Sequence, residues 1–266
     1  HEDLAGHGIE HLGGIDAAVG AGDHHHPRAL PFAQRVPALA VAAILTRLIP
    51  FSSLFRNLTT MIHEFGHAIV ALATSGTVRQ IQLKANHSGV TYGVTYSNWA
   101  SILVSLSGYM LASLFAVLLF YGYVKRQQKQ GLILISAIAL VMLVFYVHHG
   151  FGVVWLIGFI AVNVLMMFAW EKLRNFYYLL LCFLTLEESI TSPLYLAWLS
   201  IVSPGQAGDA ANLARSTFVP AIGWSILFSA FALLCAGWAI RLFSAGAYEP
   251  WRSKRSKPAK TARASR

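Results

Sequence analysis

Charged residues are scarce in this chain of 266 residues. Only 12% of the residues are Asp, Glu, Lys or Arg, whereas 56% are hydrophobic, and the mean hydropathy is +0.56. A soluble domain carries about 25% charged residues, so the composition excludes an ordinary soluble globular protein. Apolar runs of about 18 or more residues can cross a bilayer, and the candidates are 36–55, 57–75, 99–123, 131–149, 151–170, 176–202 and 217–243. We therefore expect an all-α polytopic membrane protein with about six to seven transmembrane helices.

Cysteine and acidic residues are also few. Cys182 and Cys235 both fall inside apolar runs, which predicts buried free thiols and no disulfide or metal pair. The 20 Lys and Arg exceed the 11 Asp and Glu, and the excess gathers in a basic C-terminal tail at 245–266. A basic segment directly after a membrane span is typical of a topology signal that contacts anionic lipid headgroups. We expect the lipid bilayer, and no nucleic acid, as the partner of this tail.

The chain divides into three parts by composition. Residues 1–34 are rich in Gly, Ala and His without apolar periodicity, and we predict a disordered arm that lacks the regions of a signal peptide. Its histidines have no fixed spacing, which favours a solvated tail over a metal-binding arm. Residues 35–244 are predicted to form the helical membrane domain. Inside it, alternating apolar residues flank turn signals at 86–89, which indicates a β-hairpin at about 77–97.

Loop charges orient the predicted spans. The basic loops at 125–129 and 171–174 and the C-terminal tail fall on one side if the spans alternate strictly. By the positive-inside rule this side is cytoplasmic, and the C-terminus with it. The hairpin and the loop at 203–216 are then expected on the opposite side.

Two imidazoles and a carboxylate interrupt an apolar run in the stretch TTMIHEFGHAIVAL, residues 59–72. His63 and His67 are one helical turn apart, so both can bind one zinc ion, and Glu64 can act as general base toward the attacking water. The alternative is that both histidines bond backbone or water in the helix bundle. Ionisable residues inside a membrane are expensive and usually functional, which favours the zinc site.

A catalytic zinc requires a third protein ligand. The candidates are Glu187, Glu188, Asp209, His148 and His149. Asp209 also suits a helix N-cap, and the two glutamates could instead pair with Arg174 or face a wet cavity. Depth favours the glutamates, because at about 1.5 Å per residue His67 and Glu188 lie about 15 Å and 18 Å from the same side of the membrane. Strict alternation puts Asp209 on the far side, unless its loop folds inward or one span is re-entrant.

Two segments resemble a known family. The run HEFGHAIVALATSGTVRQIQL with the following SGVTYG, and later GDAANLARSTFVPAIGWSILF, resemble the bacterial branch of the site-2 protease-like intramembrane zinc metallopeptidases, over about 57–124 and 190–240. The resemblance implies His63 and His67 as zinc ligands, Glu64 as catalytic base and Asp209 as the third zinc ligand. It also implies a location in the bacterial inner (plasma) membrane. The chain departs from the family pattern at Gly208, where Ser is usual, and it lacks both an acidic pair after the LY of its sixth span and a Leu-Asp-Gly segment.

These observations predict a zinc-dependent intramembrane peptidase that hydrolyses peptide bonds of membrane-associated protein or peptide substrates. The hairpin could offer an edge strand to an extended substrate, or it could be a plain connector. Small residues in SLSGYMLAS, at 105–113, could allow close helix contact beside the histidines. One alternative is a non-catalytic zinc-binding scaffold. Another is a metal transporter, which the His-rich arm and the His148-His149 pair suggest.

Overall fold

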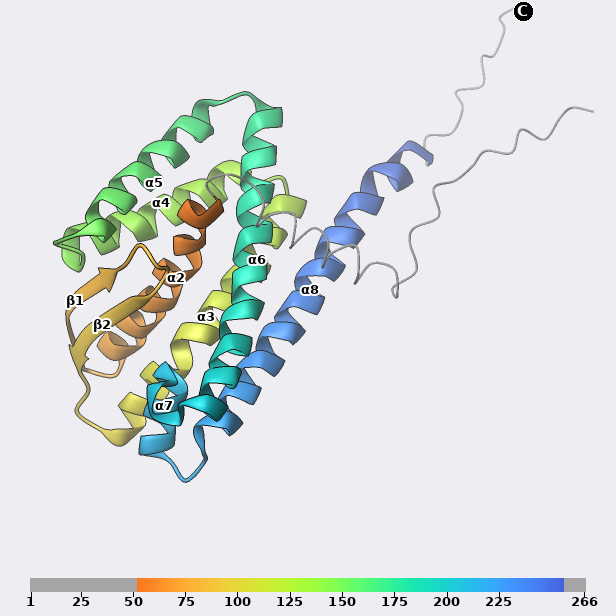
Figure 1. The fold of residues 1–266 in the computed structure, drawn as a ribbon. Coiled ribbons are helices and arrows are strands. Elements are labelled where there is room, and N and C mark those ends of the chain that lie inside the picture. The colour runs from red at the N-terminus through yellow and green to blue at the C-terminus, as the bar shows by residue number, and fades with distance from the viewer. Residues whose placement is uncertain (1–51, 256–266) are drawn as a thin grey trace, which may run out of the picture. The chain divides into compact units, whose positions relative to one another are not determined.

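Helices make up most of residues 52–255, the part of the chain that the computed structural model describes (Figure 1). In chain order the elements are α2 (Ser52–Ala73), β1 (Thr77–Leu83), β2 (Gly89–Val94), α3 (Asn98–Val124), α4 (Gln128–Phe145), α5 (Phe151–Phe168), α6 (Glu171–Val202), the 3₁₀ turn η1 (Pro204–Gln206), α7 (Gly208–Ser216) and α8 (Ala221–Arg255). The predicted N-terminal arm, most of the first predicted span and the end of the basic tail lie outside the described residues.

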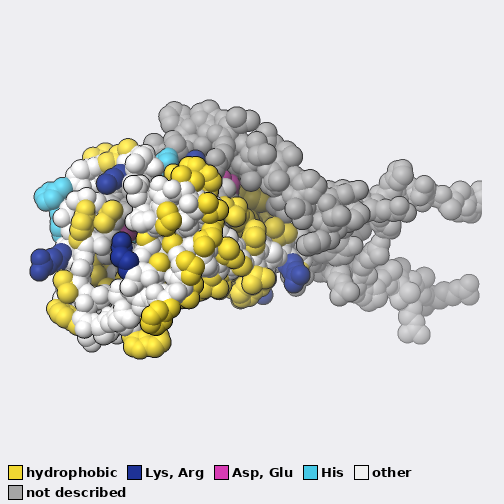
Figure 2. Space-filling model, turned by 60° about the horizontal axis from the view of Figure 1, so that its bottom comes forward, with side chains coloured by type: hydrophobic (Ala, Val, Ile, Leu, Met, Phe, Trp, Pro, Cys, Tyr) yellow, Lys and Arg dark blue, Asp and Glu magenta, His cyan; other side chains and the backbone are white. Residues whose placement is uncertain are grey.

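Five of these helices are long and apolar enough to cross a membrane: α3, α4, α5, α6 and the Ala221–Ala245 part of α8. They correspond to five of the predicted spans, and they indicate a multi-pass membrane protein. Large apolar side chains are exposed on them, and Figure 2 shows patches of hydrophobic side chains on the described part of the face turned to the viewer. This distribution suits lipid as the surrounding solvent.

Helix α2 differs from the five because it carries the polar motif. Its apolar face, with Leu58, Met61 and Ile62, is buried in the core, whereas His63 and Glu64 lie on another face. The predicted boundary between the spans 36–55 and 57–75 is wrong, because α2 runs without interruption from Ser52 to Ala73. Arg56, which lies at this boundary, forms an ion pair with α6 that is described below.

The predicted hairpin is confirmed. β1 and β2 pair antiparallel from Thr77 opposite Val94 to Leu83 opposite Gly89, and a five-residue turn joins them. The backbone N–H of Ile81 donates a 2.8 Å hydrogen bond to the carbonyl after α4, at Tyr146. β1 is therefore held on both edges, and β2 is the strand whose second edge has no strand partner among the described residues.

Helix α3 is the central element, since it contacts α2, α6, α7 and α8. Its buried face is rich in small residues, among them Gly108, Ala112 and Ala116. Small residues allow helix backbones to approach closely in membrane proteins. A Cβ added at Gly66 of α2 would lie 3.2 Å from the backbone oxygen of Ser107, so the α2 and α3 backbones are close where the histidines lie.

Candidate active site

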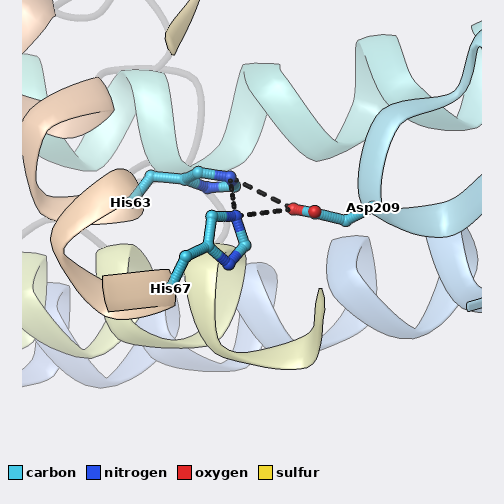
Figure 3. Close-up of side chains that lie close together, drawn as sticks. All are labelled: His63, His67 and Asp209. Carbon is cyan, nitrogen blue, oxygen red and sulfur yellow. Dashed lines mark hydrogen bonds and ion pairs between the residues drawn. The ribbon is translucent and has the colours of Figure 1, made fainter. Parts of the chain in front are cut away.

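His63, His67 and Asp209 converge at one point in the structure (Figure 3). Nε2 of His63 lies 3.0 Å from Nε2 of His67. Oδ2 of Asp209 lies 3.1 Å from Nε2 of His63 and 3.3 Å from Nε2 of His67. The two histidines share a face of α2 because four residues make about one helical turn, and the carboxylate comes from α7.

The inward fold of α7 brings Asp209 to the histidines. Ala210, Ala211 and Leu213 of this short helix are buried in a cluster with Phe228 of α8. The loop therefore folds inward, which is one of the two exceptions that strict alternation of the spans left open, and burial of this apolar face draws it into the bundle. The N-cap interpretation is wrong: Ala207 is the cap, and Asp209 lies in the first turn.

The structure places the other proposed ligands elsewhere. Glu188 forms an ion pair with Arg56 of α2 at 2.6 Å and lines a cavity, so the alternative of a side chain facing a cavity agrees with the structure, and Arg174 is not its partner. Within the described residues, only His63, His67 and Asp209 form a group of three ligand atoms within reach of one ion.

The other three residues considered as the third zinc ligand also lie away from His63 and His67. Glu187 is buried in α6, and His148 and His149 are exposed at the turn between α4 and α5. The preference for the glutamates from depth is thus not supported, since depth along a helix does not show which way a side chain points.

The ring of His67 is oriented by the backbone of α3. Its Nδ1 lies 2.7 Å from the carbonyl oxygen of Val104. A carbonyl can only accept, so Nδ1 carries a proton and donates it, and the other ring nitrogen, Nε2, is the one turned toward His63 and Asp209. Such outer partners fix the tautomer of metal-binding histidines. Sequence reasoning missed this contact, because a backbone carbonyl has no sequence signature.

Gly108 of α3 lies directly against both histidines. A Cβ added there would lie 2.5 Å from Cε1 of His63 and 2.7 Å from Cε1 of His67, too close for any side chain. The next residue, Tyr109, packs its ring edge against His63, with ring centroids 4.5 Å apart. The small-residue stretch 105–113 thus makes the close contact that its composition suggested.

Glu64 is held by the hairpin. Its Oε2 accepts a 2.5 Å hydrogen bond from the hydroxyl of Thr91 in β2. A Cβ added at Gly89 would lie 2.5 Å from Oε1, so the strand backbone also packs against the carboxylate. Glu64 is only 4% exposed. The sequence indicated a hairpin but not that it touches the carboxylate.

His63, Glu64, His67 and Asp209 all line a cavity of about 790 Å³. α2, the hairpin, α3, α6 and α7 form its walls. Burial would raise the pKa of Asp209, but the neighbouring His67 and His63 hold the pKa of this carboxyl well below its usual range. Asp209 is therefore ionised, and it supplies one negative charge to a largely buried site.

The donor set fits a zinc ion. Two imidazole nitrogens and one carboxylate oxygen are typical ligands, and a catalytic zinc uses three protein ligands and keeps one open position. Ligands 2.0–2.2 Å from a tetrahedral zinc lie about 3.3 to 3.5 Å apart, and the three separations here are 3.0, 3.1 and 3.3 Å. The geometry can thus accept a metal ion with little movement of the side chains.

Comparison with known proteins gives one match. The model of a family described as Peptidase M50B-like matches residues 36–239, a segment that contains the whole α2 to α7 site. No curated protein and no solved structure matches the chain.

Proposed function

The chain belongs to the Peptidase M50B-like family, which implies a metallopeptidase, and we propose that it is a zinc-dependent peptidase acting on membrane-associated proteins or peptides. The observation that carries the proposal is the convergence of His63, His67 and Asp209 beside Glu64, on the wall of one cavity. Peptide hydrolysis needs these two parts side by side: a group that polarises the carbonyl and a base that activates water.

His63, His67 and Asp209 would hold the zinc ion. When bound, zinc supplies Lewis acidity that polarises the scissile carbonyl and makes a water molecule more acidic. Val104 keeps the His67 ring turned toward the site through its carbonyl, and Gly108 leaves room for both rings. Glu64 and His67 are buried, and burial strengthens electrostatic interactions within the site.

Glu64 would move the protons. Its carboxylate accepts a proton from the attacking water and donates it to the nitrogen of the departing amine. The hydrogen bond from Thr91 occupies Oε2 and fixes the carboxylate plane. Glu64 is thus oriented by β2 and not by the helix that carries it.

Strand β2 is the proposed docking edge for the substrate. A helix in lipid hides its carbonyls in hydrogen bonds, so a membrane-embedded substrate must be extended locally before it is cut. β2 lines the cavity, and its second edge has no strand partner among the described residues. An extended peptide that pairs with this edge passes close to Glu64.

We further propose a location in a bacterial inner membrane with the C-terminus on the cytoplasmic side. Figure 1 supports a common side for the basic segments, because the α5–α6 connection lies at the same end of the bundle as the start of α4. The basic C-terminal tail would contact anionic headgroups there.

Purified protein in detergent tests the function. Zinc is measured by mass spectrometry of the metal, and cleavage is measured with quenched fluorescent peptides derived from membrane spans. The wild type is expected to hold about one zinc ion and to cut peptides, whereas Glu64→Gln is expected to keep the zinc and to cut none. A scaffold would bind zinc without cleavage in the wild type as well, and a wild type without stoichiometric zinc would refute the proposal.

A further inference from the structure

The cavity continues beyond the metal group along one face of α2. Arg56, Thr60, His63 and His67 follow each other along this face at intervals of three or four residues, and all line the cavity. β2 and the hairpin turn form one wall, and α6 contributes to the opposite wall. Among the lining residues, Arg56 is the only Lys or Arg.

Arg56 is incompletely satisfied by its partner. Its Nε donates a 2.7 Å hydrogen bond to Oε2 of Glu188, and its Nη2 lies 2.6 Å from the same oxygen. The other oxygen of Glu188 accepts a 3.2 Å hydrogen bond from Ser192. A guanidinium carries five N–H donors, so at least three remain, and the described residues provide no acceptor for them. The Arg56 side chain is 21% exposed and that of Glu188 12%, which makes the cation the more accessible member of the pair.

The turn residues that line this end of the cavity add no fixed charge to it; they are Asn86, His87 and Ser88. Thr60 donates a 2.8 Å hydrogen bond to the carbonyl of His87, and Nδ1 of His87 lies 3.4 Å from the amide oxygen of Asn57. Burial and the nearby Arg56 lower the pKa of His87. The imidazole is therefore neutral at pH 7, and the lasting positive charge at this end belongs to Arg56.

The length of α2 sets the distance from the scissile bond. Arg56 precedes His63 by seven residues, which corresponds to about 10 Å along the helix. An extended peptide rises about 3.3 Å per residue. A substrate lying along the cavity therefore reaches Arg56 about three residues from the bond at the metal site.

The direction of β2 sets the side of the scissile bond. His87 lies beside Thr60 and Thr91 lies beside Glu64, so β2 runs in the same direction as α2. Antiparallel pairs are the more frequent arrangement in sheets. An antiparallel substrate runs opposite to β2 and places its C-terminal side toward Arg56.

We propose that Arg56, which Glu188 holds in place, forms a specificity subsite that binds a carboxylate about three residues on the C-terminal side of the scissile bond. This inference rests on the proposed function. The carboxylate could be an Asp or Glu side chain or the terminal carboxylate of a peptide, since the guanidinium fork recognises both in the same way. The subsite would select where along an extended segment the protein cuts.

A peptide-binding assay tests the subsite without relying on turnover. The full chain with Glu64→Gln is loaded with zinc in phosphatidylcholine nanodiscs, and affinity is measured by fluorescence anisotropy. The peptides share one neutral amidated sequence in which a single Asp is moved through every position, with Asn at the same position as control. We expect one position at which Asp binds about tenfold more tightly than Asn, as one charge-assisted hydrogen bond allows.

Two variants assign this preference to the ion pair. Arg56→Gln with Glu188→Gln replaces it by two amides that can still bond each other, and the preference is expected to vanish with zinc content unchanged. Glu188→Gln alone leaves Arg56 without its competing carboxylate, and the preference is expected to increase. A preference that persists unchanged in both variants would overturn the subsite, and so would the absence of any preferred position.

Two further experiments distinguish the source of the carboxylate and separate the subsite from the proposed peptidase function. Peptides that end three residues after the bond, with a free or an amidated C-terminus, show whether a terminal carboxylate binds as well as a side chain. Active wild-type protein locates the cut relative to the preferred Asp. Cleavage without charge preference refutes only the subsite, whereas an Arg56-dependent preference without any cleavage shows that Arg56 binds the carboxylate but refutes the peptidase.

Discussion

Thr91 donates its hydroxyl to Oε2 of Glu64 at 2.5 Å, across 27 residues of sequence. The same hydroxyl lies 3.3 Å from the backbone oxygen of Glu64. The strand proposed to bind the substrate therefore also holds the proposed base. Any displacement of β2 by a paired peptide acts directly on the position of this carboxylate.

Thr91→Val tests this link, because valine keeps the branched shape and removes the donor. We expect kcat to fall by about tenfold or more, since a hydrogen bond to a charged group contributes about 1.5 to 3 kcal/mol. Zinc content should not change, because Thr91 does not touch the metal group. Thr91→Ser keeps the hydroxyl and should stay close to wild type in the same peptide assay. Equal kcat values for all three proteins would show that the bond does not orient Glu64.

Asp209→Ala tests the third ligand. Loss of the charged oxygen should lower zinc affinity by at least about 100-fold, because changes in outer partners alone weaken metal sites by 10 to 100-fold. The measurement is chelator competition on purified protein. Glu188→Gln is the matched control, since that carboxylate is paired with Arg56, and it should retain zinc. The reverse result, with zinc lost from the Glu188 variant only, would move the third ligand to α6.

Gly108→Ala tests the close contact of α3 with the histidines. The added methyl group overlaps His63 and His67, so α3 must shift, and we expect lower zinc occupancy and a lower melting temperature. Gly158→Ala in α5 is the control, because nothing lies within 4 Å of its added Cβ. This control should be neutral or stabilised by up to about 1 kcal/mol, the usual gain from replacing a helical glycine. A Gly108 variant with full zinc content would contradict the packing described.

Zinc affinity should decrease as pH falls. Each imidazole must lose a proton before it can bind the metal, so protons compete with zinc at His63 and His67, by up to about 100-fold per pH unit. Asp209 adds no dependence in this range, because its pKa is held well below the usual value and it stays ionised. Chelator competition between about pH 5.5 and 8 measures the slope. An affinity independent of pH would exclude imidazole ligands.

The histidine pair and the hairpin were predictable because their determinants are local. His63 and His67 are one turn apart in any helix, and alternation with a turn defines two strands. The apolar spans follow in the same way from composition. These features need no knowledge of how distant segments meet.

The remaining contacts depend on tertiary packing. Asp209 reaches the histidines only because α7 buries its apolar face in the bundle, and a rule of strict alternation has no means of showing this. From the sequence, Arg56 is expected at a membrane interface, and its ion pair with Glu188 becomes visible only when α6 lies beside α2. Thr91 and the carbonyl of Val104 are ordinary in sequence, and only their positions next to Glu64 and His67 give them importance.

The distant origin of Asp209 also constrains biosynthesis. The carboxylate is encoded 142 residues after His67, and α7 is held in place partly by α8, which follows it. A ribosome-bound chain with its histidines already inserted therefore lacks the complete metal group until nearly all of the membrane domain has been translated. The proposed peptidase therefore cannot become active before the bundle is assembled.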